Sequence, residues 1–111
     1  MPSFYIRLPD TSRLRTAGEF AFSTQGADGI ATELQDALRR DGLFARWRAA
    51  QEDPDAVDPA LGATDPDAKV TGQPDDLHLD LIVHTQLPGP VLKHRLRLLA
   101  GSAWELRDVS A

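Results

Sequence analysis

The sequence predicts an α+β fold, a two-layer α/β sandwich in which a four-stranded mixed sheet carries two main helices on one face. Four segments alternate apolar and polar side chains with the period of two that is typical of half-buried strands, and two segments repeat apolar residues at helical spacing. The 111 residues, 41% hydrophobic and 26% charged, have the size and composition of one soluble domain with one core. We therefore interpret residues 1–111 as a single domain.

Two strands are expected near the start of the chain. Apolar side chains alternate with polar ones in residues 4–8, and the pattern ends at Pro9. Phe20 and Phe22 alternate with smaller or charged residues in residues 19–24. We interpret this second segment as a strand that pairs with the first through a long loop.

The next segment changes from the strand period to the helical period. Its predicted apolar face consists of Ala27, Ile30, Ala31, Leu34, Ala37 and Leu38. We expect Ser23 or Thr24 to cap the start of this helix and Gly42 to form a left-handed cap at its end. Residues 43–51 then resume a helical pattern, which Pro54 stops.

Residues 52–76 form a compositional break in the middle of the chain. They carry eight of the 17 acidic residues against Lys69 as the one base, and they also hold four prolines. This composition predicts a long, acidic, solvent-exposed and flexible loop, with a short extended piece at 68–71 as an open alternative. Loops of this length are commonly functional or disordered.

The last third of the chain predicts a strand, a helix and a strand. Residues 77–84 give the clearest alternation, residues 90–99 form a helical face that begins at a proline and ends near Gly101, and residues 104–109 close the chain with Trp104 and Leu106 on one face. The expected element order is β-β-α, acidic loop, β-α-β. A strand-helix-strand unit of this kind favours a right-handed crossover between parallel strands, which makes the predicted sheet mixed.

The polar face of the strand at 77–84 is the first candidate surface, and its members are His78, Asp80, Ile82 and His84. His78 and His84 are separated by roughly 20 Å along a strand, too far to share one metal ion. His78 and Asp80, about 7 Å apart, could supply two ligands, and a third would have to come from His94 or from the acidic loop. A metal-dependent enzyme on this face is therefore the second alternative function, and we expect no catalytic residue, metal or cofactor.

The second candidate surface is basic. Arg46 and Arg48 flank Trp47 in the predicted helical extension, and Lys93 and Arg97 lie one turn apart on the last helix. These residues suggest a binder of nucleic acid or of a small anionic ligand, which is the first alternative function. The net charge of −5 and the pI near 5.0 argue against nucleic acid, because nucleic-acid readers are usually basic.

The function expected from the sequence is that of a non-catalytic protein-interaction or accessory module. An apolar residue within a polar face, as Ile82 is here, can bind a partner protein. No window is apolar enough to span a membrane, and there is neither a cysteine nor a secretory signal, so we expect a cytoplasmic protein with no membrane partner. A homodimer through edge strands stays open as an alternative.

Overall fold

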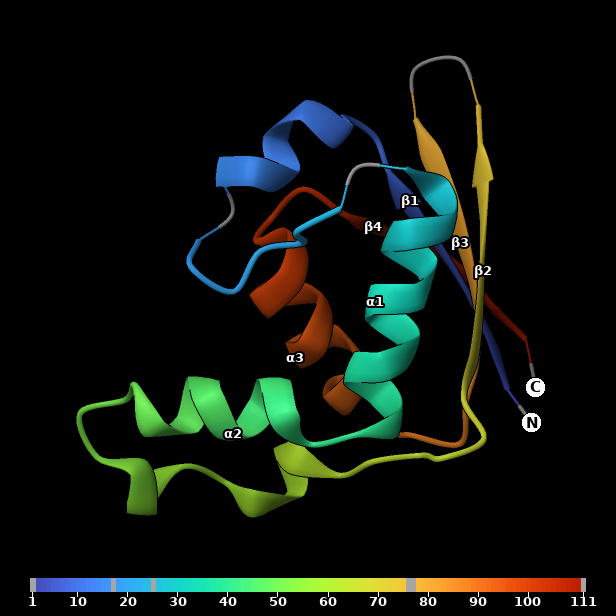
Figure 1. The fold of residues 1–111 in the computed structure, drawn as a ribbon. Coiled ribbons are helices and arrows are strands. Elements are labelled where there is room, and N and C mark those ends of the chain that lie inside the picture. Colours follow the sequence, from blue (N-terminus) through green and yellow to red (C-terminus); the bar gives the residue numbers. More distant parts are fainter. Residues whose placement is uncertain (1, 17, 25, 76–77, 111) are drawn as a thin grey trace.

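The computed structural model describes residues 2–16, 18–24, 26–75 and 78–110, and it confirms the two-layer α+β class (Figure 1). The four strands are β1 (Ser3–Leu8), β2 (Lys69–Pro74), β3 (Leu79–His84) and β4 (Glu105–Ser110), in the sheet order β2-β3-β1-β4. The α-helices are α1 (Ala27–Arg39), α2 (Gly42–Ala49) and α3 (Gly89–Ala100), and the short 3-10 turns are η1 (Thr11–Thr16), η2 (Pro54–Ala56) and η3 (Pro59–Gly62). Helices α1 and α3 lie on the same face of the sheet (Figure 1). None of these helices is both long enough and apolar enough to cross a lipid bilayer.

The sheet is antiparallel, so the prediction of a mixed sheet is wrong. Each pair of neighbouring strands, β2 with β3, β3 with β1 and β1 with β4, runs antiparallel. Because β3 and β4 both run antiparallel to β1, they run parallel to each other with β1 between them. Helix α3 therefore connects two parallel strands as expected, but the strands are not neighbours.

The predicted strand at residues 19–24 is also wrong, since this segment forms turns. Phe22 is nevertheless buried, and its backbone N–H donates to the carbonyl of Leu99 at the end of α3, at 2.9 Å. The segment thus uses its phenylalanine to pack against a helix and gives its backbone hydrogen bond to that helix. Two alternating aromatic residues were too few to distinguish a strand from such a packed turn.

Strand β2, which completes the four-stranded sheet, lies inside the predicted acidic loop. Of the six residues of β2, Val70 is buried, Gly72 is partly buried and the others are exposed. A side chain at Gly72 would meet the carbonyl oxygen of Ala27 at 2.6 Å, so the strand needs glycine to pass under the start of α1. A strand with one buried side chain shows almost no alternation of apolar and polar residues. The acidic, proline-rich composition of residues 52–76 therefore favoured the prediction of a loop over that of a strand.

The buried faces of the helices agree with the sequence, but their caps do not. Ile30, Ala31, Leu34, Ala37 and Leu38 of α1 are all buried, as predicted. The N-cap of α1 is Gly26, which makes no side-chain cap. Instead, the carboxylate of Glu33 inside the helix accepts the backbone N–H groups of both Ser23 and Thr24, at 2.9 and 3.0 Å through Oε1.

Gly42 does not end α1 in a left-handed conformation; it begins α2. The last carbonyls of α1 are satisfied from elsewhere in the chain, because the N–H of Asp65 donates to Leu38 at 2.8 Å and the side chain of Arg95 donates to Ala37 at 2.7 Å. Gly101, with φ of 59°, does end α3 as expected.

Arg95 of α3 is fully buried. Its Nη1 donates to the carbonyl of Ala37, and its Nη2 donates to the carbonyls of Leu61 at 2.9 Å and Ala63 at 2.7 Å. The guanidinium carbon lies 5.9 Å from the centroid of the Phe44 ring, within the range of a cation–π contact. Burial lowers the pKa of Arg95. One side chain therefore joins α3 to the end of α1 and to the segment that contains η3.

Asp65 is the second buried charge of the same region. The backbone N–H of Gln86 donates to Oδ2 at 3.0 Å, the hydroxyl of Thr85 donates to the same oxygen at 2.8 Å, and the N–H of Asp67 donates to Oδ1 at 3.0 Å. These hydrogen bonds, that from Gln86 above all, hold the pKa of Asp65 below its usual range. An aspartate of the predicted acidic loop thus belongs to the core.

We expect Arg95→Met to destabilise the protein by about 3 kcal/mol, because it leaves three inward-facing carbonyls without their donor. Urea unfolding followed by circular dichroism measures this loss. Arg97→Met, on the exposed face of the same helix, is the matched control and should stay within about 0.5 kcal/mol of the wild type. Equal stability of the two variants would show that Arg95 does not hold the segments together.

We expect Asp65→Asn to lower stability at pH 7 by about 1 to 3 kcal/mol, because an amide cannot replace a carboxylate that accepts hydrogen bonds through both oxygens. The pKa of Asp65 is lowered in the fold, so its contribution is present above the unfolded pKa of about 3.9 and is lost as the pH falls through the folded pKa. The gap between wild type and variant should therefore close at low pH. Urea unfolding from pH 7 to pH 2 measures the stability difference between the two proteins. A difference that is independent of pH would contradict a stabilising role for the ionised carboxylate. Asp67→Asn, at an exposed carboxylate, is the control.

Candidate functional site

The face of the sheet that α1 and α3 leave uncovered carries the first candidate surface (Figure 1). Strand register places its outward side chains in cross-strand rows. The middle row consists of Thr71, Ile82, Tyr5 and Asp108, on β2, β3, β1 and β4 in turn. Ile82 therefore has an aromatic neighbour, Tyr5, whose exposure of 36% makes it one of the most exposed large hydrophobic residues in the described part of the chain. The sequence indicated Ile82 but not Tyr5, because cross-strand neighbours depend on strand order.

A shallow groove of about 350 Å³ runs across this face. It is lined by Tyr5, Ile6, Arg7, Gln73, Asp80, Leu81, Ile82 and Arg107. Its lining includes the apolar pair Tyr5 and Ile82 and, in the next cross-strand row, the charged pair Arg7 and Asp80. We call this surface the sheet groove.

The charged groups at the sheet groove are joined in pairs. Arg7 Nε donates to Asp80 Oδ1 at 3.0 Å, and Arg107 Nη1 donates to Glu105 Oε2 at 3.1 Å. The hydrogen bond from Arg7 holds the pKa of Asp80 below its usual range, and the same bond raises the pKa of Arg7. The bond from Arg7 keeps the carboxylate of Asp80 ionised, and both pairs orient their carboxylates.

The two histidines of the predicted face, His78 and His84, lie at its opposite ends. His84 Nδ1 lies 2.8 Å from the hydroxyl oxygen of Ser3, in the row beyond Ile82. His78, just before the strand, has its Nε2 atom 3.4 Å from Asp80 Oδ2 and 3.3 Å from Asp75 Oδ2. The structure thus brings His78 and Asp80 together as expected and adds a third group, Asp75. The sequence indicated the acidic loop as one source of a third ligand but did not single out Asp75, because the strand that leads to it, β2, was taken for a loop.

The basic residues of the second candidate surface are engaged in different ways. Arg48 Nε donates to the carbonyl of Pro54 at 2.9 Å, and its Nη2 lies 3.8 Å from Asp55 Oδ1. Lys93 is half-buried, whereas Arg97 is exposed. The most buried base of the predicted cluster, Arg95, faces the core. Arg48 therefore has local partners on the segment after α2, and Lys93 and Arg97 differ in exposure.

Trp47 packs against α3. Its ring centroid lies 4.5 Å from that of His94 and 5.8 Å from that of Phe44. Burial in this aromatic cluster, followed by the charges of Arg95 and Arg97, lowers the pKa of His94. Trp47 is thus a packing residue between α2 and α3, with its ring only partly exposed.

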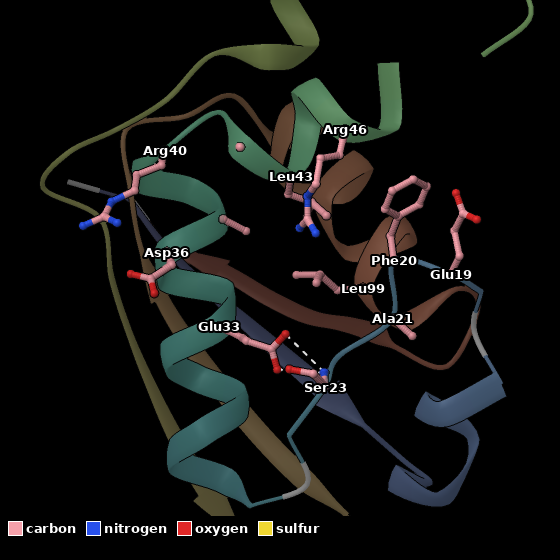
Figure 2. A pocket seen from close by; sticks show the side chains of 12 residues that line it. Glu19, Phe20, Ala21, Ser23, Glu33, Asp36, Arg40, Leu43, Arg46 and Leu99 are labelled. Atoms are coloured by element: carbon pink, nitrogen blue, oxygen red, sulfur yellow. Dashed lines mark hydrogen bonds between the residues drawn. The ribbon is translucent and has the colours of Figure 1, made fainter. Parts of the chain in front are cut away.

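Arg46 reaches from α2 into the cleft that Figure 2 shows. This cleft of about 630 Å³ is lined by Glu19, Phe20, Ala21, Ser23, Glu33, Asp36, Ala37, Arg40, Gly42, Leu43, Arg46 and Leu99. Three carboxylates and two guanidinium groups line it, and Figure 2 shows the side chain of Arg40 pointing away from the centre. The excess of carboxylates makes the cleft a poor site for an anion.

Comparison of the chain with protein-family models, with curated proteins and with solved structures gave no match. What this chain can do is therefore argued from its own side chains and their geometry.

We expect Arg7→Met to raise the pKa of Asp80 toward its ordinary value of about 3.9, because the variant removes the donor that stabilises the carboxylate. A carbon-13 NMR titration of the aspartate carboxyl groups measures this change. Arg107→Met, which removes a cation bonded to Glu105 instead, should leave the pKa of Asp80 nearly unchanged. An equal rise in both variants would mean that the charge of the whole face, and not the bond from Arg7, sets this pKa.

Proposed function

We propose that this chain is a non-catalytic protein-interaction module, and that its partner is a different protein that inserts an apolar side chain between Tyr5 and Ile82 of the sheet groove. The observation that carries the proposal is the position of this pair at the centre of an uncovered sheet face, within a setting of paired charges. Aromatic and aliphatic side chains at the centre of a polar rim are the usual composition of a contact that supplies most of the binding energy.

The surrounding polar groups support a contact surface more than a reaction centre. Arg7 is bonded to Asp80 and Arg107 to Glu105, so these groups point at each other. Each guanidinium has further N–H donors, which can bind backbone carbonyls of a partner at the ends of the groove. The exposed amide of Gln73 adds one donor and one acceptor.

The edges of the sheet support a partner on the face over a second copy joined edge to edge. The N–H of Val109 on edge strand β4 donates to the carboxylate of Asp108 at 2.9 Å, so it is not open to another strand. The other edge strand, β2, begins at Lys69 and ends at Pro74, and charged residues and proline are common means of preventing edge pairing.

The alternative of an anion or nucleic-acid binder has weaker support. Such a binder needs cations gathered on one surface, and here Arg48 is bonded to the segment after α2 while Arg46 shares its cleft with three carboxylates.

Site-specific photo-crosslinking in a lysate of the source cell tests the proposal. A photoreactive residue at Thr71, beside Ile82, should give an adduct with one other protein, whereas the same residue at Ala45, exposed on α2, should not. Nuclease treatment should leave the adduct unchanged. A nucleic-acid adduct, an adduct with a second copy of this chain, or the same adducts from both positions would each overturn the proposal.

We expect Ile82→Lys to reduce the yield of this adduct at least about tenfold, because a charge replaces an apolar contact at the centre of the groove. Affinity for the partner identified by the adduct can then be measured with purified proteins. Thr71→Lys, at the margin of the same row, is the matched control and should weaken binding less. Circular dichroism and thermal unfolding of both variants separate loss of binding from loss of fold.

A further inference from the structure

The turn between β2 and β3 brings together side chains that are separate in the sequence pattern. The N–H of Asp75 donates to the carbonyl of His78 at 2.9 Å, and the N–H of His78 donates to the carbonyl of Asp75 at 3.3 Å. These bonds close the hairpin and hold both residues at its end. Asp80 follows two residues after His78, on the same side of the strand.

One ligand atom from each residue lies within 4.8 Å of the other two. His78 Nε2 is 3.3 Å from Asp75 Oδ2 and 3.4 Å from Asp80 Oδ2. This nitrogen is buried and lies at ion-pair distance from both carboxylates, but neither contact has the geometry of a hydrogen bond. A polar atom in such a position requires an explanation, because buried nitrogen and oxygen atoms nearly always have a partner.

The two distances fit a shared metal ion better than a hydrogen bond. Ordinary N–H···O distances are about 2.7 to 3.2 Å. Ligand atoms that bind a tetrahedral zinc ion at about 2.1 Å lie roughly 3.4 Å from one another. Both separations from His78 Nε2 are close to this value, and the two carboxylate oxygens, which lie within 4.8 Å of each other, would need to approach by about 1.4 Å at most.

The neighbouring groups would support a metal ion. Arg7 binds Oδ1 of Asp80 and leaves Oδ2 directed toward His78, the arrangement in which a second hydrogen bond orients a ligating carboxylate. The guanidinium also offsets one of the two carboxylate charges, which reduces their repulsion in the absence of the ion. Asp75 is 60% exposed, so an ion can enter from solvent and keep a water molecule or a partner group as its fourth ligand.

From this geometry we propose that Asp75, His78 and Asp80 bind one divalent transition-metal ion of the zinc class. One imidazole nitrogen and two carboxylate oxygens suit zinc and its first-row neighbours, whereas calcium takes six to eight oxygen ligands and magnesium demands octahedral oxygen coordination. The site does not depend on the proposed protein partner, because it is formed by one hairpin and by Arg7.

Titration of the metal-free full chain with zinc chloride, followed by calorimetry and by nitrogen-15 NMR of the histidine rings, tests the site. We expect saturation at one ion per chain and a shift of the His78 Nε2 resonance, with little change at His84 and His94. Cobalt chloride should give visible absorption bands of a nitrogen and oxygen site. No saturable binding up to millimolar zinc, or several equivalents bound without a preferred histidine, would overturn the proposal.

The chain offers matched variants for this test. His78→Ala and Asp75→Asn should each weaken zinc binding at least about tenfold, and Asp75 is exposed enough that its variant should keep the fold. His84→Ala removes a histidine of the same strand that faces Ser3 instead, and it should bind zinc like the wild type. Equal weakening by His84→Ala would overturn the assignment. Binding to the protein partner is measured separately, so failure of one proposal leaves the other to its own experiment.

Discussion

The fold depends on one buried arginine that has carbonyl oxygens as its partners. Arg95 is fully buried and gives hydrogen bonds to Ala37, Leu61 and Ala63. A buried charge is costly, and it is tolerated here because a planar guanidinium can serve several carbonyls at once. The carbonyl of Ala37 lies in the last turn of α1, where helical carbonyls lack partners within the helix and the helix dipole favours a cation. Arg95 therefore completes α1 while it fixes the segment around η3 against α3.

This contact determines the path of the middle of the chain. Once η3 is held by Arg95, the chain reaches Asp65, whose carboxylate accepts hydrogen bonds from Thr85 and Gln86 at the end of β3. These two residues place the chain at the edge of the sheet, where β2 starts four residues later and pairs with β3. The sheet groove and the proposed metal site both depend on the pairing of β2 with β3. It supplies Gln73 to the sheet groove and Asp75 to the proposed metal site.

The sequence predicted the parts of the fold in which local periodicity and burial coincide. The faces of α1 and α3, the strands β1 and β3, and the two-layer class all follow from repeated apolar residues. Strand β4 was also predicted, from Trp104 and Leu106, although none of its residues is buried. The predictions were wrong for segments in which only one residue is buried or in which the buried residue is charged. Val70 alone gives β2 little alternation, and the burial of Arg95, which lies between Lys93 and Arg97 in the sequence, was not predicted because a charged side chain is usually exposed. Tyr5 was missed for a different reason, since cross-strand proximity depends on a strand order that no local pattern contains. Asp75, three residues before His78, was not singled out because β2 was taken for a loop.

Asp80 connects the two proposed sites physically. Its Oδ1 accepts from Arg7 at the end of the sheet groove, and its Oδ2 faces His78 in the proposed metal site. A metal ion on Oδ2 and the guanidinium of Arg7 on Oδ1 would share one carboxylate, so a partner that bonds to Arg7 would also act on a ligand of the ion. By thermodynamic linkage, a change that the ion causes in the affinity for such a partner requires the partner to change the affinity for the ion by the same factor. The shared carboxylate therefore makes the two sites reciprocal if both are occupied, and independent only if one of them is never filled.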